Sequence, residues 1–146
     1  MASELGPSEA VAVPGLTRVL VVDDDFDSAE VLGLVLGDAG YDVRVEMTAR
    51  KAIDAASEFT PHFAIVDIGL PETSGYELVA ILRSIPHLNE CRYIALSGHA
   101  TESMSKQSLV VGFERHLNKP ITIERVLAAL EAPRASVASR TTRGER

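Results

Sequence analysis

Short apolar stretches alternate with longer segments in which apolar residues recur at helical spacing. The short stretches have the length of strands and are bounded by turn residues. They predict five strands, at residues 18–22, 41–45, 63–67, 93–96 and 113–118. The second stretch alternates apolar and polar residues, which is typical of an edge strand or of a strand with one exposed face. The first, third and fourth stretches are apolar runs, and the fifth contains both apolar and polar residues.

A segment with helical periodicity follows each predicted strand. In the first, Asp27 is expected to cap the helix with Glu30 three residues later, as in a capping box, and Gly40 ends it. Its apolar residues at helical spacing are Val31, Leu32, Val35 and Leu36. The other four helices are expected to begin at Thr48, Ser74, Thr101 and Thr122.

Strands that alternate with helices imply βαβ units, a parallel sheet and helices on both faces. We therefore predict an α/β fold, namely a flavodoxin-like doubly wound sheet of five parallel strands in the order 2-1-3-4-5, with five helices. In such a sheet, ligands bind beyond the carboxyl ends of the strands, where the strand order reverses. Residues at the carboxyl ends of the predicted strands are therefore expected to form the site.

The chain has 146 residues, and its length and composition fit a single domain with an ordinary core. We expect a flexible leader at 1–17, a folded domain at 18–131 and a disordered basic tail at 132–146. The net charge is −7 and lies mainly in the folded part, which argues against general binding to nucleic acid. No apolar run is long enough to span a membrane, and Cys91 is the only cysteine. A cytoplasmic location is expected.

Four of the five strands end in polar groups that could take part in chemistry: Asp23 with Asp24, Asp67, Ser97 and Lys119. A single Asp in such a place is commonly a turn former or a helix cap. The predicted strand order, however, places the first and third strands side by side, so three carboxylates are expected to converge. Unpaired, they would repel and raise one another's pKa values. A divalent cation such as Mg²⁺ would relieve this repulsion.

A carboxylate bound to a metal can act as a nucleophile toward phosphorus. Such a reaction needs positive charge and a hydrogen-bond donor at the phosphoryl oxygens, which Lys119 and Ser97 could supply. Taken singly, a serine that ends a strand is commonly a turn residue, and a lysine before proline is commonly a solvated charge. Their joint occurrence at adjacent strand ends indicates a phosphoryl-transfer site.

These pieces, in this order and spacing, resemble the receiver domain of bacterial two-component response regulators. The resemblance spans about residues 17–131, and its motifs are 19–25 (Val-Leu-Val-Val-Asp-Asp-Asp), 63–75, 94–98 (Ile-Ala-Leu-Ser-Gly) and 112–120. It implies that Asp67 accepts a phosphoryl group from a histidine of a sensor kinase. The Leu-Ser-Gly-His stretch and the segment 112–120 are similar to receivers attached to hybrid kinases.

The resemblance also implies roles for the residues around Asp67. Asp24 and Asp67 would bind Mg²⁺ directly, together with the backbone carbonyl of Gly69, while Asp23 would hold a metal-bound water. Ser97 and Lys119 would contact the phosphate, and the Lys119–Pro120 peptide bond would be cis.

Two histidines stand at positions with a family role. His116 occupies the position, three residues before the lysine, where many members carry a switching Tyr or Phe. A surface histidine without a switching role is an equal alternative. His99 lies two residues after Ser97, beside the expected attacking water, although a loop histidine that faces solvent is the simpler interpretation. None of the four histidines has the spacing of a zinc site.

The function expected is a phosphorylatable switch rather than an enzyme, although it would promote its own phosphorylation and dephosphorylation. Its partners would be a sensor histidine kinase or a histidine phosphotransfer protein and a downstream protein, and a phosphorylation-dependent dimer is a further option. No DNA-binding or catalytic domain follows Pro133 in this sequence. Apolar residues at 109–111 suggest a partner or dimer face.

Two alternatives stay open at this point. An aspartyl phosphatase would usually carry a second Asp two residues after its nucleophile, where this chain has Gly69. An unphosphorylated pseudo-receiver scaffold would have no need for the complete set of polar strand ends.

Overall fold

The strands form one parallel sheet in the order β2-β1-β3-β4-β5, as the sequence predicts. The computed structural model describes residues 15–88, 90–98 and 110–133. The strands are β1 (Arg18–Val22), β2 (Asp42–Glu46), β3 (Phe63–Asp67), β4 (Arg92–Ser97) and β5 (Phe113–Asn118). β3 is buried along its whole length because it lies at the centre of the sheet, whereas β2 is half-buried at the edge.

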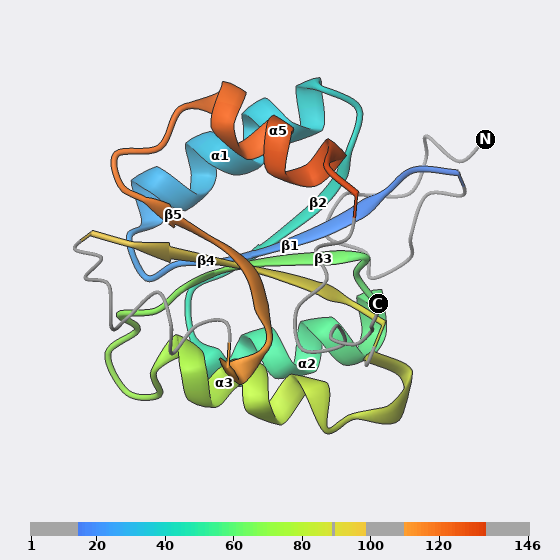
Figure 1. Ribbon diagram of the computed structural model, residues 1–146, viewed down its shortest axis with the longest axis vertical. Helices are drawn as coiled ribbons and strands as arrows, with labels where there is room; N and C mark the ends of the chain where they lie inside the picture. The colour runs from blue at the N-terminus through green and yellow to red at the C-terminus, as the bar shows by residue number, and fades with distance from the viewer. Residues whose placement is uncertain (1–14, 89, 99–109, 134–146) are drawn as a thin grey trace, which may run out of the picture.

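Helices cover both faces of the sheet in a three-layer arrangement (Figure 1). The helices are α1 (Phe26–Asp38), α2 (Ala49–Phe59), α3 (Gly75–Arg83) and α5 (Ile123–Glu131), with a short 3₁₀ helix η2 at Pro86–Leu88. α1 and α5 pack on one face, and α2 and α3 pack on the other. Most of the helix expected from Thr101 lies outside the described residues, although its last positions, 110 and 111, are helical.

Side-chain caps begin the helices, as the sequence predicts for three of them. Thr48, Ser74 and Thr122 each accept a hydrogen bond from the backbone N–H three residues later. The prediction for the first helix is wrong, because Asp25 and not Asp27 is its cap. Asp25 has an extended backbone, and its carboxylate accepts hydrogen bonds from the N–H and the hydroxyl of Ser28. α1 therefore begins at Phe26.

The rotation of α1 about its axis decides which of its residues reach the core. Ala29, Leu32 and Leu36 are buried against the sheet, whereas Val31 is 59% exposed. Val35 is likewise on the solvent side, at 36% exposure. Gly33 helps to set this rotation, because a Cβ atom there would lie 2.9 Å from a methyl group of Val45 on the edge strand. The apolar stripe read from the sequence is thus only half buried.

An irregularity in the pairing of β4 with β5 sets the facing of the last strand. Tyr93 pairs with Phe113, but the next residue, Ile94, pairs with Arg115, so Glu114 is an extra residue on β5. Leu117 consequently packs in the core beneath α1 and α5, although Phe113 belongs to the core on the other side. Within the described residues, none of the helices has the length and apolar character needed to cross a membrane.

Candidate functional site

Three carboxylates meet at the carboxyl ends of β1 and β3, which are neighbours in the sheet. Asp23 and Asp67 are buried, and Asp24 is exposed. One oxygen of each lies within 4.8 Å of the others. The strand order thus brings Asp24 and Asp67 together, although 42 residues separate them along the chain.

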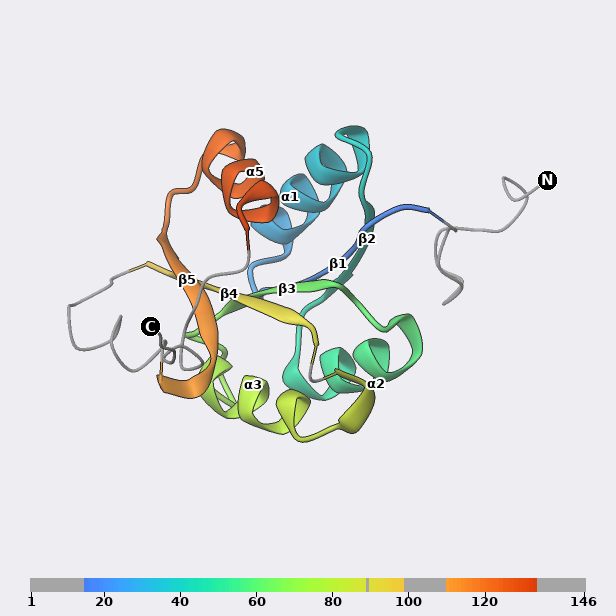
Figure 2. The same ribbon diagram turned by 45° about the vertical axis from the view of Figure 1, so that its right-hand side comes forward.

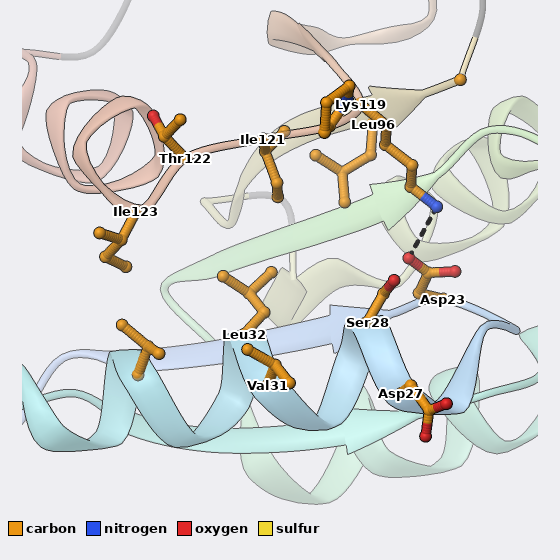
Figure 3. Close-up of a pocket in the computed structure, with 13 residues that line it drawn as sticks. Asp23, Asp27, Ser28, Val31, Leu32, Leu96, Lys119, Ile121, Thr122 and Ile123 are labelled. Carbon is orange, nitrogen blue, oxygen red and sulfur yellow. Dashed lines mark ion pairs between the residues drawn. The ribbon is translucent and has the colours of Figure 1, made fainter.

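Lys119, directly after β5, reaches this cluster. Its Nζ lies 2.9 Å from Oδ2 of Asp23 and 3.4 Å from Oδ2 of Asp67. Figure 3 shows the lysine pointing toward Asp23, with the ion pair dashed. The backbone N–H of Lys119 donates to the carbonyl of Ser97 at 2.8 Å, and the Lys119–Pro120 peptide bond is cis, as expected. The chain thus places one cation among the carboxylates.

Burial and charge act against each other in this cluster. Burial raises the pKa of Asp23, and the nearby charge of Asp67 adds to the increase, while the N–H of Asp25 and the ammonium group of Lys119 oppose it. Burial alone would lower the pKa of Lys119, but its hydrogen bond to Asp23 and the charges of Asp23 and Asp67 raise it overall. Lys119 is therefore a cation at neutral pH, and it offsets the repulsion among the carboxylates.

Asp67 is held by the turn that follows it. Its Oδ1 accepts a hydrogen bond from the N–H of Gly69 at 2.9 Å, which leaves Oδ2 facing Lys119. The N–H of Gly75, the first residue of α3, donates to the carbonyl of Ile68 at 2.9 Å. A Cβ atom at Gly75 would lie 2.7 Å from the backbone oxygen of Asp67, so only glycine fits there. Gly75 is not among the residues predicted for the site, although its place directly after the Ser74 cap was an available signal.

Two further predicted site residues, Ser97 and His116, lie on β4 and β5 at or near the same end of the sheet. Ser97 is buried at the end of β4, opposite Asn118 on β5. His116 is paired with Ala95, so its side chain lies on the same face of the sheet as that residue. Burial lowers the pKa of His116, which favours the neutral imidazole. His99 lies outside the described residues.

A groove of about 670 Å³ opens beside the cluster, between α1 and the connection from β5 to α5. Figure 3 shows Asp23 and Lys119 at one end of it and apolar side chains along its length. The apolar lining comes from both sides: Val31, Leu32, Val35, Leu96, Pro120, Ile121 and Ile123. Sequence reasoning missed this groove because it assigned Val31 and Val35 to the same apolar stripe as the buried leucines.

The fold and this cluster define a doubly wound α/β domain with an acidic pocket and an opposed lysine. The sequence matches the family described as "Response regulator receiver domain" over residues 19–131, and the chain belongs to that family. Response regulators are among its homologues, and phosphorylation and Mg²⁺ binding are typical of the family.

Curated relatives differ in how much of their length the chain spans. It is 34% identical to an uncharacterized 14.6 kDa protein of Leptolyngbya boryana over 103 residues, which cover 70% of this chain and 79% of that protein. It is 33% identical over 117 residues to the transcriptional regulatory protein KdpE of Mycobacterium tuberculosis, covering 80% of this chain but only 50% of KdpE. The match to the signal transduction histidine-protein kinase BarA of Escherichia coli is 26% identical and covers 87% of this chain and 14% of BarA.

Solved structures share the fold. The chemotaxis protein CheY4 of Vibrio cholerae superposes with a TM-score of 0.77 at 26% identity, over 80% of this chain and 98% of CheY4. A response regulator of Burkholderia pseudomallei, solved with a phosphorylated aspartic acid and a calcium ion, has a TM-score of 0.74 at 31% identity. That comparison covers 80% of this chain and 67% of the regulator.

Proposed function

We propose that Asp67 accepts a phosphoryl group from a phosphohistidine of a sensor kinase or of a phosphotransfer protein. One observation carries this proposal: Oδ2 of Asp67 faces the cation of Lys119, while Oδ1 is held by the N–H of Gly69. In the transfer, a carboxylate oxygen forms a bond to phosphorus as the nitrogen–phosphorus bond of the donor breaks, and the histidine keeps the electron pair. Lys119 and Ser97 would stabilise the charge on the phosphoryl oxygens.

The donor set suits Mg²⁺, because this cation prefers oxygen ligands and three carboxylates converge here. Asp24, Asp67 and the carbonyl of Gly69 would hold the ion directly, and Asp23 would hold it through water. When bound, the ion would neutralise charge on the carboxylates and on the phosphoryl group. The protein's own part is to fix Asp67 and to keep Lys119 charged.

The same pocket would release the phosphate to water. Gly69 has no side chain to cover the phosphate. Among the described residues, a Cβ atom there would meet only Oδ1 of Asp67 within 4 Å, at 3.6 Å. We therefore propose that the domain promotes its own dephosphorylation, with His99 as a group that could order the attacking water. His116 would tune the switch as a neutral ring beside β4.

The phosphodonor protein would dock on α1 and on the groove beside it. The groove adjoins Asp23 and Lys119, so a partner seated there could bring a histidine to Asp67. On the outer side of α1, Phe26 is 55% exposed and Leu34 is 66% exposed. Apolar side chains of this size on the surface favour a protein partner.

Output would proceed through binding of a downstream protein in the cytoplasm, or through a phosphorylation-dependent dimer. Val110, in the segment expected to form a partner face, is 84% exposed. A pseudo-receiver scaffold is disfavoured because Lys119 lies within ion-pair distance of both buried carboxylates. A phosphatase is disfavoured because Gly69 stands where its acid–base residue would be.

The test is phosphorylation of the chain by acetyl phosphate with Mg²⁺, followed by intact-mass spectrometry. We expect the wild-type chain to gain one phosphate and Asp67→Asn to gain none. Asp27→Asn is the matched control, because Asp27 is an exposed carboxylate at the groove with no proposed part in binding Mg²⁺ or the phosphoryl group. An adduct that persists in Asp67→Asn, or the lack of any adduct in the wild-type chain, would contradict the proposal.

A further inference from the structure

Helix α3 contacts the phosphoacceptor at one end and the entry to β5 at the other. At its first residue, Gly75 packs so closely that an added Cβ atom would lie 2.7 Å from the Asp67 oxygen and 2.7 Å from the Ile68 Cα. At its last residue, Nη1 of Arg83 donates to the carbonyl of Val111 at 2.8 Å. One helix of nine residues therefore joins two distant segments of the chain.

At the Arg83 end of α3, the guanidinium group fits closely against the backbone of Gly112. Gly112 has a φ of +128°, a backbone conformation that favours glycine. A Cβ atom at Gly112 would also lie 2.5 Å from Nη1 of Arg83, so the guanidinium group occupies the space that a side chain would need. The ring of Tyr76, in the first turn of α3, meets the ring of Phe113 edge to face, with centroids 6.3 Å apart. In Figures 1 and 2, the orange start of β5 lies beside α3.

We propose that α3 is a relay that transmits phosphorylation of Asp67 to residues 110–112. This inference rests on the proposed function of Asp67. A phosphoryl group adds negative charge and oxygen acceptors to a carboxylate whose Oδ1 is already bonded to the N–H of Gly69. In this proposal the turn from Asp67 to Gly75 adjusts to the added group, and the close packing of Gly75 against Asp67 and Ile68 passes the adjustment to the helix.

A short helix moves as a rigid element, so a shift at Gly75 changes the position of Arg83. Arg83 then carries the change to the Val111 carbonyl, which lies next to the exposed side chain of Val110. This relay runs through the α2 and α3 layer, on the side of the sheet away from the groove beside α1. It would allow a phosphodonor and an output partner to use opposite sides of the domain.

The test measures the backbone amide signal of Gly112 by NMR before and after beryllofluoride is added together with Mg²⁺. Beryllofluoride bound to Asp67 mimics the phosphoryl group. The variant is Arg83→Ala, with Arg83→Lys as the conservative variant and Arg50→Ala, an exposed arginine on α2, as the matched control. Phosphate uptake from acetyl phosphate is measured in parallel by mass spectrometry. We expect Arg83→Ala to lose at least about half of the Gly112 shift change while phosphate uptake stays within about twofold of wild type.

Recovery of part of the shift change in Arg83→Lys, and an unchanged response in Arg50→Ala, would support the relay. A full Gly112 response in Arg83→Ala with normal phosphate uptake would overturn the relay alone. Loss of both phosphate uptake and the Gly112 response in Arg83→Ala would also overturn it, because Arg83 would then support the site itself. A wild-type chain that takes up no phosphate would overturn the proposed function together with the relay.

Discussion

Replacing Lys119 by methionine tests whether this lysine serves mainly as a counter-charge. Its Nζ lies 2.9 Å from Asp23 and 3.4 Å from Asp67, and the Asp23 side chain is only 3% exposed. Lys119→Met removes the positive charge and keeps most of the apolar stem. Two buried carboxylates and the exposed Asp24 would then face one another without this cation.

The structure sets the size of the effect. Two unit charges about 4 Å apart interact by about 4 kcal/mol at an effective dielectric constant of about 20, and loss of one partner of a buried pair costs about 3–5 kcal/mol. The Lys119 side chain is 26% exposed, so solvent screens part of the interaction. We therefore expect the free energy of unfolding to fall by about 2–3 kcal/mol in the absence of Mg²⁺.

Mg²⁺ should reverse part of this loss, because a dication supplies the charge that the lysine gave. Removing a neighbouring cation should also tighten Mg²⁺ binding, and a tenfold increase in affinity corresponds to about 1.4 kcal/mol of added stability at saturation. Phosphorylation should nevertheless be slower, because Lys119 no longer stabilises the phosphoryl oxygens.

The assay is urea unfolding of wild type and Lys119→Met with EDTA and with saturating Mg²⁺, alongside Mg²⁺ titration of both. Lys51→Met is the control, because Lys51 is an exposed lysine on α2. An equal loss of stability with and without Mg²⁺ would refute the counter-charge role. Weaker Mg²⁺ binding in Lys119→Met would refute it as well.

Two further predictions concern the opposite end of the sheet. His62 accepts a hydrogen bond at Nδ1 from the N–H of Arg18, and burial followed by the charge of Arg18 lowers its pKa. Its stabilising contribution is present above its ordinary pKa of about 6.5 and is lost as the pH falls through the lower pKa of the folded state. The free energy of unfolding, measured in urea between about pH 8 and 5, should therefore fall less steeply with decreasing pH in His62→Gln than in wild type. An unchanged pH dependence would contradict this. Arg92 donates two hydrogen bonds of 2.9 Å to the buried Glu114. Arg92→Met should therefore lower the free energy of unfolding in urea by about 3–5 kcal/mol, and adding Glu114→Leu should restore part of this loss. A double variant whose loss equals the sum of the two single losses would contradict the prediction.

The sequence alone determined the class of fold, the strand order and the family, because local patterns carry that information. Apolar runs fix buried strands, and Thr48, Ser74 and Thr122 mark helix starts through contacts only three residues away. The start of α1 was misassigned because three consecutive aspartates and a fourth at position 27 can all cap a helix. The choice of Asp25 depends on where β1 ends and how the chain turns.

Tertiary structure decided the features that depend on approach between distant segments. Periodicity could not separate the buried Leu32 from the exposed Val31, because the rotation of α1 depends on its packing over Val45. The contact of Arg83 with Val111 joins positions 28 residues apart and has no local pattern. The ends of the strands could be foreseen as one site, since the topology of a parallel sheet aligns them. Three features could not be foreseen, because they are set by side-chain packing across the whole domain. These are the groove beside α1, the face of the sheet on which each side chain of β5 lies, and the contacts that α3 makes at its two ends.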